Sequence, residues 1–521
     1  MTGRFEKIFW DFVVVLILSG IVVKTLEDNS SIVVQKSKFF LYRALTYSIF
    51  LLFPVWTQKS LELDRMSQIV MMICYMGFIT AQYFLLGKEI DHRLKIYFRV
   101  NSSLDRIIYR IHLGMFFFIF YFNALNFLPD KWINNTFWVT WAILGLFYSW
   151  PTRGKIIQES VTTNFNEFKY LDRFEKTLLI LIFTMVAVSI PEFTRLNSIG
   201  ALKLFFDPSE TVSPLVWNFL TVNYFPFKKY PELFKTAWSL HFYFSFFVMF
   251  VFIFYSTLRY FVSRRLSLLG TFALVSSWSV TKILASDVGI ALDSTFPLLW
   301  IWALMWSTKS STYRSGLFVG LVNFWGVLIN PINIILAVFQ TVALYYLFSA
   351  KKTHWYRRQM LRYASFGLSM ALLAFLMSGT KMTHMWNFGL NLSELWSVLE
   401  RKAFFSLSIF AVLIFGLQKL VPNKIKAVRD FKIDEDKFGE VAISLLFIAV
   451  VSLFFQTDNF RAFGLMWPVA LMSVIPLEFL FQSISRLRSS RNMIYLAYIL
   501  VCLLDSHIEG RIKIILRIFN S

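Results

Sequence analysis

The chain has 521 residues, of which 57% are hydrophobic and 19% aromatic, whereas only 16% are charged. A soluble core of this size does not need so many apolar residues, and they come in runs separated by charges, so we expect an all-α polytopic membrane protein. The formal charge of +21 does not indicate nucleic-acid binding, because the basic residues lie at the ends of the apolar runs. There they are typical of cytoplasmic anchoring and contact with anionic membrane lipids. Cys74 and Cys502 lie within apolar runs and predict neither a disulfide framework nor a metal site.

Apolar runs long enough, or nearly long enough, to cross the hydrocarbon core as helices occur about sixteen times. We interpret the first, Ile8–Val23, as a retained helix rather than a signal peptide, because Asp11 lies near its start and no small-residue cleavage site closes it. The later predicted spans are Phe39–Val55, Ser67–Leu86, Ile111–Phe127, Thr136–Trp150, Thr177–Ile190, Leu240–Leu258, Leu266–Ile283, Ser294–Trp306, Gly316–Ile329, Ile332–Phe348, Tyr363–Gly379, Ala403–Leu417, Val441–Phe455, Phe463–Phe481 and Met493–Leu504.

The connections between these spans alternate between two groups that differ in charge. The first group is rich in Lys and Arg and contains Lys88–Arg110, Arg259–Arg265, Lys351–Arg362 and Arg486–Arg491. The second group has scarcely any net positive charge and contains Asp130–Asn135, Ala285–Asp293, Asn330–Pro331 and Gln456–Arg461. Cytoplasmic loops carry an excess of Lys and Arg, so the first group is predicted to be cytoplasmic. The long connections Pro191–Trp238 and Thr380–Lys402 are then external, as are both ends of the chain.

The connection Pro191–Trp238 is polar, carries charges of both signs, and contains several prolines and aromatic residues. A long loop in a tightly connected protein is usually functional or disordered, and the aromatic residues argue against disorder. We therefore expect short amphipathic segments at a membrane surface. The predicted domains are an N-terminal five-helix region (1–150), a cytoplasmic linker (151–176), a central module with the two external loops 191–238 and 380–402 (177–402), and C-terminal helices (403–521).

From Lys176 onward the order of elements is one span, a long external loop, six further spans and a second external loop. Within it, a basic turn opening Arg259–Gly270, a small-residue segment Ser276–Ser279, an acidic residue closing Ala291–Asp293 and a glycine-rich Gly316–Leu321 follow one another. This region resembles the membrane module of the GT-C glycosyltransferases. The resemblance implies an enzyme of the bacterial inner membrane that transfers a sugar from a polyprenyl-phosphate carrier to an acceptor on the external face.

In the GT-C family the first external loop carries an acidic residue that acts as general base or metal ligand. The corresponding residues here are Glu192, Asp207 and Glu210. Asp287 and Asp293, on a short external turn, are candidate ligands of a divalent cation, Mg²⁺ or Mn²⁺. Basic residues of the external loops are the candidates for binding the carrier phosphate. They are Arg195, Lys228, Lys229, Lys381, His384, Arg401 and Lys402.

Two alternative functions remain open. The adjacent acidic pair usual in the GT-C family is absent, which favours a non-catalytic scaffold that binds lipid, or a partner protein through its N-terminal helices. A transporter or flippase is the third hypothesis, and it predicts paired charges inside the membrane. The spans offer few such charges beyond Asp11, Lys282 and Glu478.

A second resemblance is weaker. Tyr148–Lys155 resembles the Tyr-Ser-x-Pro segment of intramembrane prenyltransferases, which need two Asp-rich motifs to bind diphosphate. Only Asn101–Asp105 comes near such a motif, and no second one follows it.

Overall fold

The computed structural model describes residues 79–80, 82–91, 103–125, 128–129, 132, 170–206, 215–216, 247–278, 280–281, 288–309, 315–342, 354–377, 474, 490–506 and 508–513. Every regular element in these segments is helical and none is a strand, which confirms the predicted all-α class.

The chain divides into two compact units. One comprises Met1–Met71 and Leu125–Tyr170, and the other comprises Met72–Ala124 and Leu171–Ser521. Little of the first unit belongs to the described segments. The second unit contains nearly all the described helices. The domain boundaries predicted from the sequence remain predictions.

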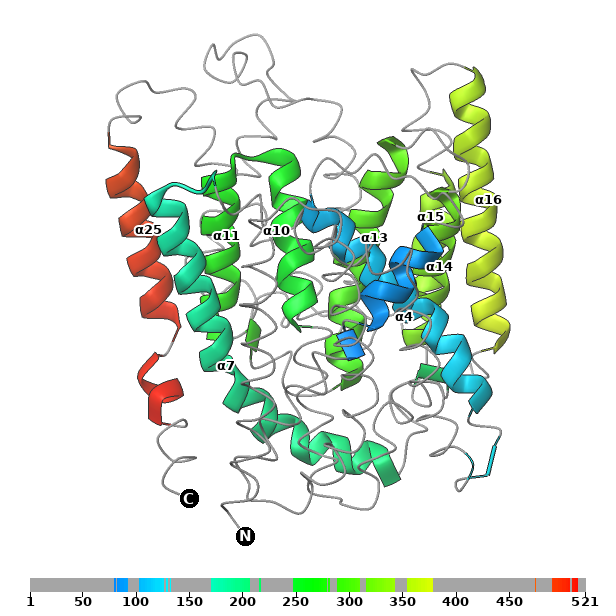
Figure 1. Cartoon of the computed structure of the whole chain (residues 1–521), viewed down its shortest axis with the longest axis horizontal. Helices are drawn as coiled ribbons and strands as arrows, with labels where there is room; N and C mark the ends of the chain where they lie inside the picture. Colours follow the sequence, from blue (N-terminus) through cyan, green and yellow to red (C-terminus); the bar gives the residue numbers. More distant parts are fainter. Residues whose placement is uncertain are drawn as a thin grey trace, which may run out of the picture. The chain divides into compact units, whose positions relative to one another are not determined.

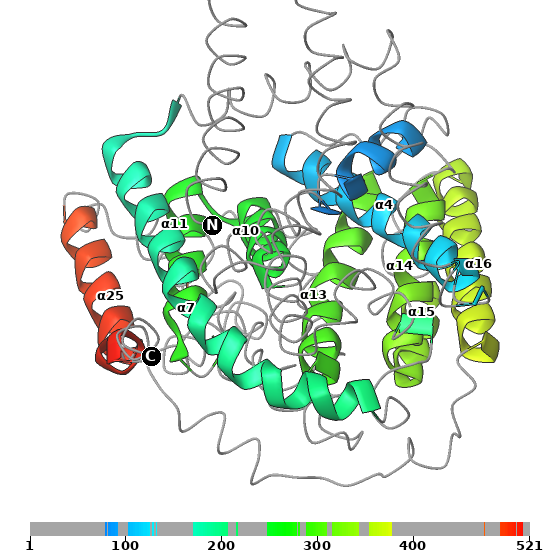
Figure 2. The ribbon, with the colours of Figure 1, turned by 60° about the horizontal axis from the view of Figure 1, so that its bottom comes forward.

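The labelled helices of the second unit pack in a defined order (Figures 1 and 2). They are α4 (Ser103–Leu125), α7 (Arg173–Phe206), α10 (Met249–Phe261), α11 (Arg264–Ser276), α13 (Val288–Lys309), α14 (Ser315–Ile329), α15 (Ile334–Val342), α16 (His354–Met377) and α25 (Arg491–Asp505), with the short 3₁₀ turn η4 (Pro331–Asn333) before α15. α11 packs against α25, α7 and α10; α10 packs against α13, α13 against α14, and α14 and α15 against α16.

Local backbone conformation explains where several of these helices begin and end. Val262 and Ser263 are extended, so α10 stops and α11 starts after only two connecting residues. Extended Ser277 ends α11. At the far end of α14, the Asn330 side chain accepts a hydrogen bond from the Ile332 N–H, and Pro331 opens η4, a position where its missing N–H costs little.

An aromatic cluster of the core lies where α4, α13 and α14 meet. The Phe318 ring is 4.8 Å from Tyr109 and 6.1 Å from Trp302, measured between ring centroids. Phe116 is 6.4 Å from Trp325. These contacts run in the same direction along α4 and α14, so the two helices are parallel at this point. The Cβ position of Gly326, near the end of α14, is filled by the Phe296 ring from the first half of α13, so α13 and α14 are antiparallel.

One helix of the described part of the chain, Leu104–Ala124 within α4, is long and apolar enough to cross a membrane. Shorter apolar helices occur at Thr295–Met305, Gly316–Ile329, Pro331–Gln340, Ala364–Met377 and Arg491–Leu504. Each coincides with part of a predicted span. The predicted number of about sixteen spans remains a prediction.

Several predicted boundaries are wrong. α16 begins at His354, so most of the predicted connection Lys351–Arg362 is helical. α7 does not end at Ile190 but continues through Pro191 to Phe206, so the first part of the predicted external loop is helical. The predicted turn Ala285–Asp293 is also partly helical, because α13 begins at Val288 and places Asp293 inside the helix rather than at its start. Similarly, residues 82–91 are helical and α4 begins at Ser103, so both ends of the predicted connection Lys88–Arg110 are helical.

Candidate functional site

The predicted site residues are only partly reached by the described structure. Glu192 and Arg195 lie on the second half of α7, and Asp293 lies near the start of α13; only their backbone is described. The other predicted site residues lie outside the described segments: Asp207, Glu210, Lys228, Lys229, Asp287, Lys381, His384, Arg401 and Lys402.

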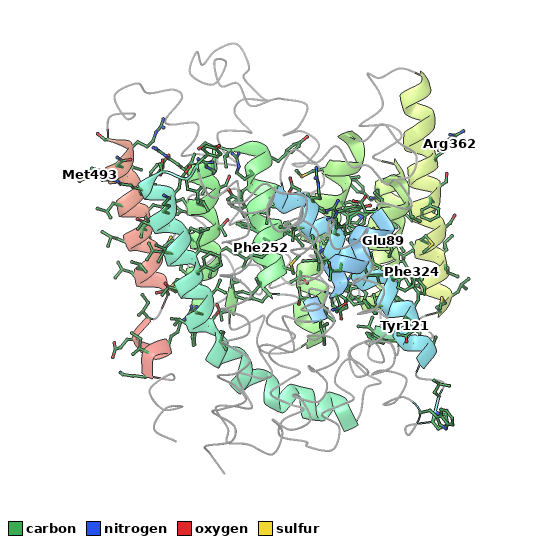
Figure 3. The ribbon with its side chains drawn as sticks, in the orientation of Figure 1. Glu89, Tyr121, Phe252, Phe324, Arg362 and Met493 are labelled. Atoms are coloured by element: carbon green, nitrogen blue, oxygen red, sulfur yellow. The ribbon has the colours of Figure 1, made fainter. Side chains whose placement is uncertain are left out.

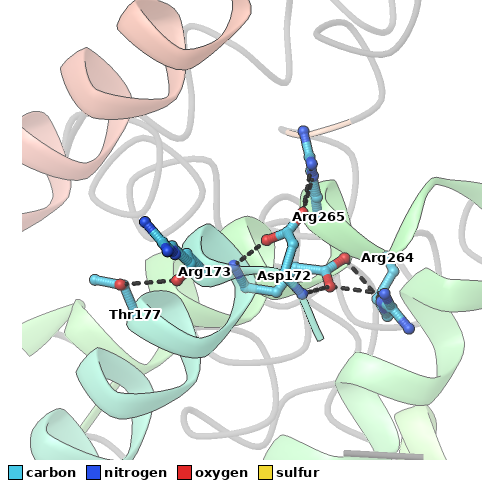
Figure 4. A network of polar contacts seen from close by, with 6 residues as sticks. Asp172, Arg173, Thr177, Arg264 and Arg265 are labelled. Carbon is cyan, nitrogen blue, oxygen red and sulfur yellow. Dashed lines mark hydrogen bonds and ion pairs between the residues drawn. The ribbon is translucent and has the colours of Figure 1, made fainter. Parts of the chain in front are cut away.

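Four charged side chains join the first turns of α7 and α11 (Figure 4). Arg264 donates two hydrogen bonds to Glu175, each 2.7 Å long, in the bidentate arrangement that suits a guanidinium and a carboxylate. Arg265 donates from Nε to Asp172 Oδ2 at 2.8 Å and forms a second bond to the same oxygen. The two arginines follow the α10–α11 turn, whereas both carboxylates open α7. The ion pairs therefore hold these two parallel helices together at their N-terminal ends.

Asp172 and Glu175 also cap α7. The Asp172 side chain accepts from the Glu175 N–H at 2.7 Å, and the Glu175 side chain accepts from the Asp172 N–H at 3.0 Å, which is a reciprocal capping box. Partial burial disfavours ionisation of Asp172, but the hydrogen bonds from the Glu175 N–H and from Arg265 outweigh it and hold its pKa below the ordinary value. The hydrogen bonds from Arg264 to Glu175 raise the pKa of Arg264. Both shifts favour the charged forms of Asp172 and Arg264.

Basic residues concentrate at this end of the second unit, which we call the basic end. Figure 3 shows Arg362 near the upper end of α16 and Met493, close to Arg491, near the upper end of α25. In the described helices the basic residues at this end include Arg173, Lys176, Arg259, Arg264, Arg265, Arg362 and Arg491. The last turns of α11, α14, α16 and α25 lie at the opposite end and contain no Lys or Arg, although Arg511 and Lys513 follow α25.

The described part of the predicted external loop lies at the opposite end. Glu175 fixes the start of α7 at the basic end, and Figures 1 and 2 show α7 changing direction and passing across the lower end of α13, which it contacts. A second point of attachment is Asn123, near the end of α4, whose side chain donates to the Leu215 carbonyl at 2.9 Å. Val216 beside it is fully buried. The second half of α7 and residues 215–216 therefore both lie at the end of the bundle where α13 starts.

A second polar group lies inside the bundle. The indole Nε1 of Trp302 on α13 donates to the Ser256 hydroxyl on α10 at 2.9 Å, and Ser256 donates to the carboxylate of Asp105 on α4. All three side chains are buried, and Asp105 is only 4% exposed. In the sequence, Asp105 is notable only as the last residue of Asn101–Asp105. Ser256 and Trp302 lie 151 and 197 residues after it, so local patterns could not identify the group.

An ion pair lies beside this group. The helix that ends at Asp91 packs antiparallel to α4, because Gly87 lies against the Arg110 carbonyl and Gly114 against the Tyr83 carbonyl with no room for a Cβ. Asp91 accepts from Arg110 Nε at 3.1 Å, and the two side chains are 13% and 16% exposed. The pair joins residues 19 positions apart on two helices, and the sequence did not reveal it.

Arg511 is a further buried cation, with 1% of its surface exposed. It donates to the Thr281 hydroxyl at 3.1 Å and to the Ser276 carbonyl at 3.4 Å, and its guanidinium lies 5.4 Å from the centre of the Trp278 ring. Thus Arg511 caps the C-terminal end of α11 and joins it to the segment after α25.

No family model, curated protein or solved structure matches this chain. Within the described segments, no group of three or more His, Cys, Asp or Glu side chains is arranged to hold a metal ion. The proposed function therefore depends on the sequence pattern together with the position of the loop.

Proposed function

We propose that this chain is an integral membrane protein that transfers a sugar from a polyprenyl-phosphate carrier to an acceptor on the external face of the bacterial inner membrane. The observation that carries the proposal is the path of the loop that contains the candidate base. α7 runs from the basic end to the opposite end and includes the first part of this loop. At the opposite end the loop is attached to α4 through the hydrogen bond from Asn123 to the Leu215 carbonyl. The backbone of Glu192, one of the three candidates for the base, follows this path towards the end of the bundle where α13 starts, which supports the proposal.

Membrane embedding is supported by the distribution of charge and of exposed apolar side chains. The basic end fits the cytoplasmic side by the positive-inside rule. Large apolar side chains are exposed along helices on the outside of the unit, including Leu496 and Leu504 on α25 and Leu376 on α16. A solvent-facing helix surface rarely carries so many, whereas a lipid-facing one does.

The position of Glu192 along α7 fits a catalytic base at the external surface. It is 19 residues after Arg173 (192 minus 173), and a helix of that length spans roughly 28 Å, close to the thickness of the hydrocarbon core. Asp293 lies near the start of α13, at the same end. A carboxylate there would accept the proton of the acceptor hydroxyl, and Asp287 and Asp293 would bind the divalent cation that neutralises the leaving phosphate.

The test is transfer of label in proteoliposomes. Polyprenyl phosphates carrying [¹⁴C]glucose or [¹⁴C]mannose are supplied with a membrane extract as acceptor, and loss of label from the lipid fraction is measured. Glu192→Gln, Asp207→Asn and Glu210→Gln are assayed singly, with and without EDTA. We expect one of them to lower the rate at least 100-fold, because general bases contribute roughly 10²–10⁴.

The matched control is Glu509→Gln. Glu509 is an exposed carboxylate paired only with Lys513 among the described residues, so its neutralisation should leave transfer unchanged. Full activity in all three loop variants would refute the assignment of the base. Absence of transfer by the wild-type protein with both donors would refute the proposal for these sugars and favour the non-catalytic scaffold.

Transport is the second candidate function, and the interior charges favour it. Asp105 is buried within the segment Leu104–Ala124, and the Asp91–Arg110 pair lies nearby. Ionisable residues inside membrane helices commonly mark ion or proton pathways. Proton flux into pyranine-loaded proteoliposomes tests this hypothesis: a flux that Asp105→Asn abolishes would support it, and wild-type flux equal to that of empty liposomes would exclude proton coupling.

A further inference from the structure

We infer that the seam between α7 and α25 at the basic end binds an anionic phospholipid, with its phosphate on Arg173 and Lys176 and its acyl chains along the outer faces of the two helices. The inference rests on the proposed membrane location, but not on the glycosyltransferase activity.

The seam is formed by an aromatic contact between the two helices. The Phe174 and Tyr495 rings are stacked with their centroids 5.3 Å apart and their planes at 24°. Phe174 follows Arg173 directly, and Tyr495 is one turn after Arg491. The contact therefore brings basic residues from the first turns of two distant segments of the chain to one place on the surface.

The carboxylates at the start of α7 do not balance the charges of Arg173 and Lys176. Asp172 and Glu175 are already paired with Arg265 and Arg264. Arg173 and Lys176 are exposed, and no carboxylate of the described segments pairs with either one. Figure 4 shows the Arg173 side chain directed away from the ion pairs of α11. An excess of positive charge thus remains at the seam, which is complementary to a phosphate.

The surface below the seam is apolar on both helices. On α7, Lys176 is followed at helical spacing by Ile180 and Phe183, which are 64% and 52% exposed. Residues at i, i+4 and i+7 share one face of a helix, so the ammonium group stands at the head of an apolar stripe.

The matching stripe on α25 starts at Met493 and continues through Leu496 and Leu500 to Leu504, with exposures of 70%, 51%, 53% and 84%. Its eleven-residue rise is roughly 16 Å, about the depth of one leaflet of the hydrocarbon core. A basic headgroup site above a short apolar stripe on α7 and a stripe of leaflet depth on α25 matches a phospholipid, whereas free phosphate would use only the upper part.

The experiment compares lipid retention by native mass spectrometry of the full-length protein in mild detergent, titrated with phosphatidylglycerol or phosphatidylcholine. We expect phosphatidylglycerol to bind at least tenfold more tightly. Arg173→Gln/Lys176→Gln should remove a tenfold preference, because two basic residues that each contribute roughly fivefold near an anionic lipid surface contribute about 25-fold together. The control is Arg362→Gln, which removes an exposed arginine on α16 at the basic end. This substitution should not change the preference for phosphatidylglycerol.

The outcomes separate the possible ligands. Inorganic phosphate at millimolar concentration should not displace the lipid; displacement by phosphate alone would overturn the assignment of the acyl-chain stripes. Equal binding of both lipids, or an unchanged preference in the double variant, would overturn the headgroup site. Because the substituted side chains are exposed, the double variant should fold and retain its sugar-transfer rate, so loss of transfer by the loop variants and loss of the lipid preference are separate results.

Discussion

Replacing Glu175 with Gln should destabilise the protein more than any other single change among the four charged residues that join α7 to α11. Glu175 is the most buried of the four, with 4% of its side chain exposed, and it accepts both bonds of the Arg264 guanidinium. It also accepts from the Asp172 N–H in the capping box of α7. One substitution therefore weakens an ion pair and a helix cap together.

The size of the expected loss in unfolding free energy follows from how exposed each partner of the ion pair is. Breaking a fully buried ion pair costs about 3–5 kcal/mol, whereas an exposed pair contributes about 0–1 kcal/mol. Arg264 is 35% exposed, so water compensates part of its lost bonds, and Gln can still accept one hydrogen bond. We therefore expect Glu175→Gln to lower the free energy of unfolding by about 2 kcal/mol. Asp172 and Arg265 are 35% and 38% exposed, so Asp172→Asn should cost less than about 1 kcal/mol.

The assay is reversible unfolding in mixed micelles, with the free energy extrapolated to zero denaturant. Double-mutant cycles with Arg264→Gln and Arg265→Gln isolate the two pair energies. The Glu175–Arg264 coupling should exceed the Asp172–Arg265 coupling by about 1 kcal/mol. Equal couplings, or a Glu175→Gln variant as stable as Asp172→Asn, would refute the argument from burial.

Three further predictions concern pH, packing and orientation. The lowered pKa of Asp172 stabilises the fold at pH values well above its ordinary pKa of 3.8, so the stability difference from Asp172→Asn should shrink as pH falls through and below that value, measured by melting at pH 7 and pH 3. Gly114→Ala should cost at least about 2 kcal/mol, because its Cβ would meet a backbone carbonyl, whereas Gly510→Ala, with open space around it, should not destabilise; equal melting temperatures would contradict this. Ser263→Cys and Glu509→Cys, in a protein lacking its native cysteines, should react with an impermeant maleimide from opposite sides of sealed vesicles, and labelling of both from one side would exclude the proposed orientation.

Apolar runs and charge patterns predicted the helical class and several turns because both depend on residues close together in the chain. Arg264 and Arg265 lie at a helix start, as the basic turn between two predicted spans required, and Asn330 and Pro331 separate α14 from α15 as predicted. The apolar runs and the charges between them can be read from short stretches of sequence, so the helical class and these turns could be predicted without knowing the fold.

The boundary at Pro191 failed for a physical reason. Proline usually ends a helix, since it removes an N–H and disfavours helical backbone in the preceding residue. In α7 the helix continues past it, and only the bond to the Ala187 carbonyl is lost. The predicted turn Ala285–Asp293 failed because its polar residues do not prevent a helix: α13 already runs from Val288 and includes Asp293.

The polar contacts could not be predicted because they join distant parts of the chain. Glu175 and Arg264 are 89 residues apart, and Ser256 and Asp105 are 151 apart. In the local sequence, each of these residues is an ordinary helix-end charge or small polar residue, and only the packing of the helices shows its partner. The same holds for Asn123 and Leu215, whose contact links α4 to the predicted external loop.

The direction of the hydrogen bonds in the bundle separates the two possible roles of Asp105. Trp302 donates to Ser256 and Ser256 donates to Asp105, so the carboxylate is needed as an acceptor whether or not its charge has a function. Asn at 105 retains an acceptor oxygen and loses the charge, whereas Ala loses both and leaves a buried hydroxyl unsatisfied, at about 1–3 kcal/mol. If Asp105 only joins α4 to α10 and α13, Asp105→Ala should melt well below the wild type and Asp105→Asn near it, with sugar transfer intact in Asp105→Asn. If Asp105→Asn is as stable as the wild type but has lost sugar transfer, the charge of Asp105 is itself required for that activity.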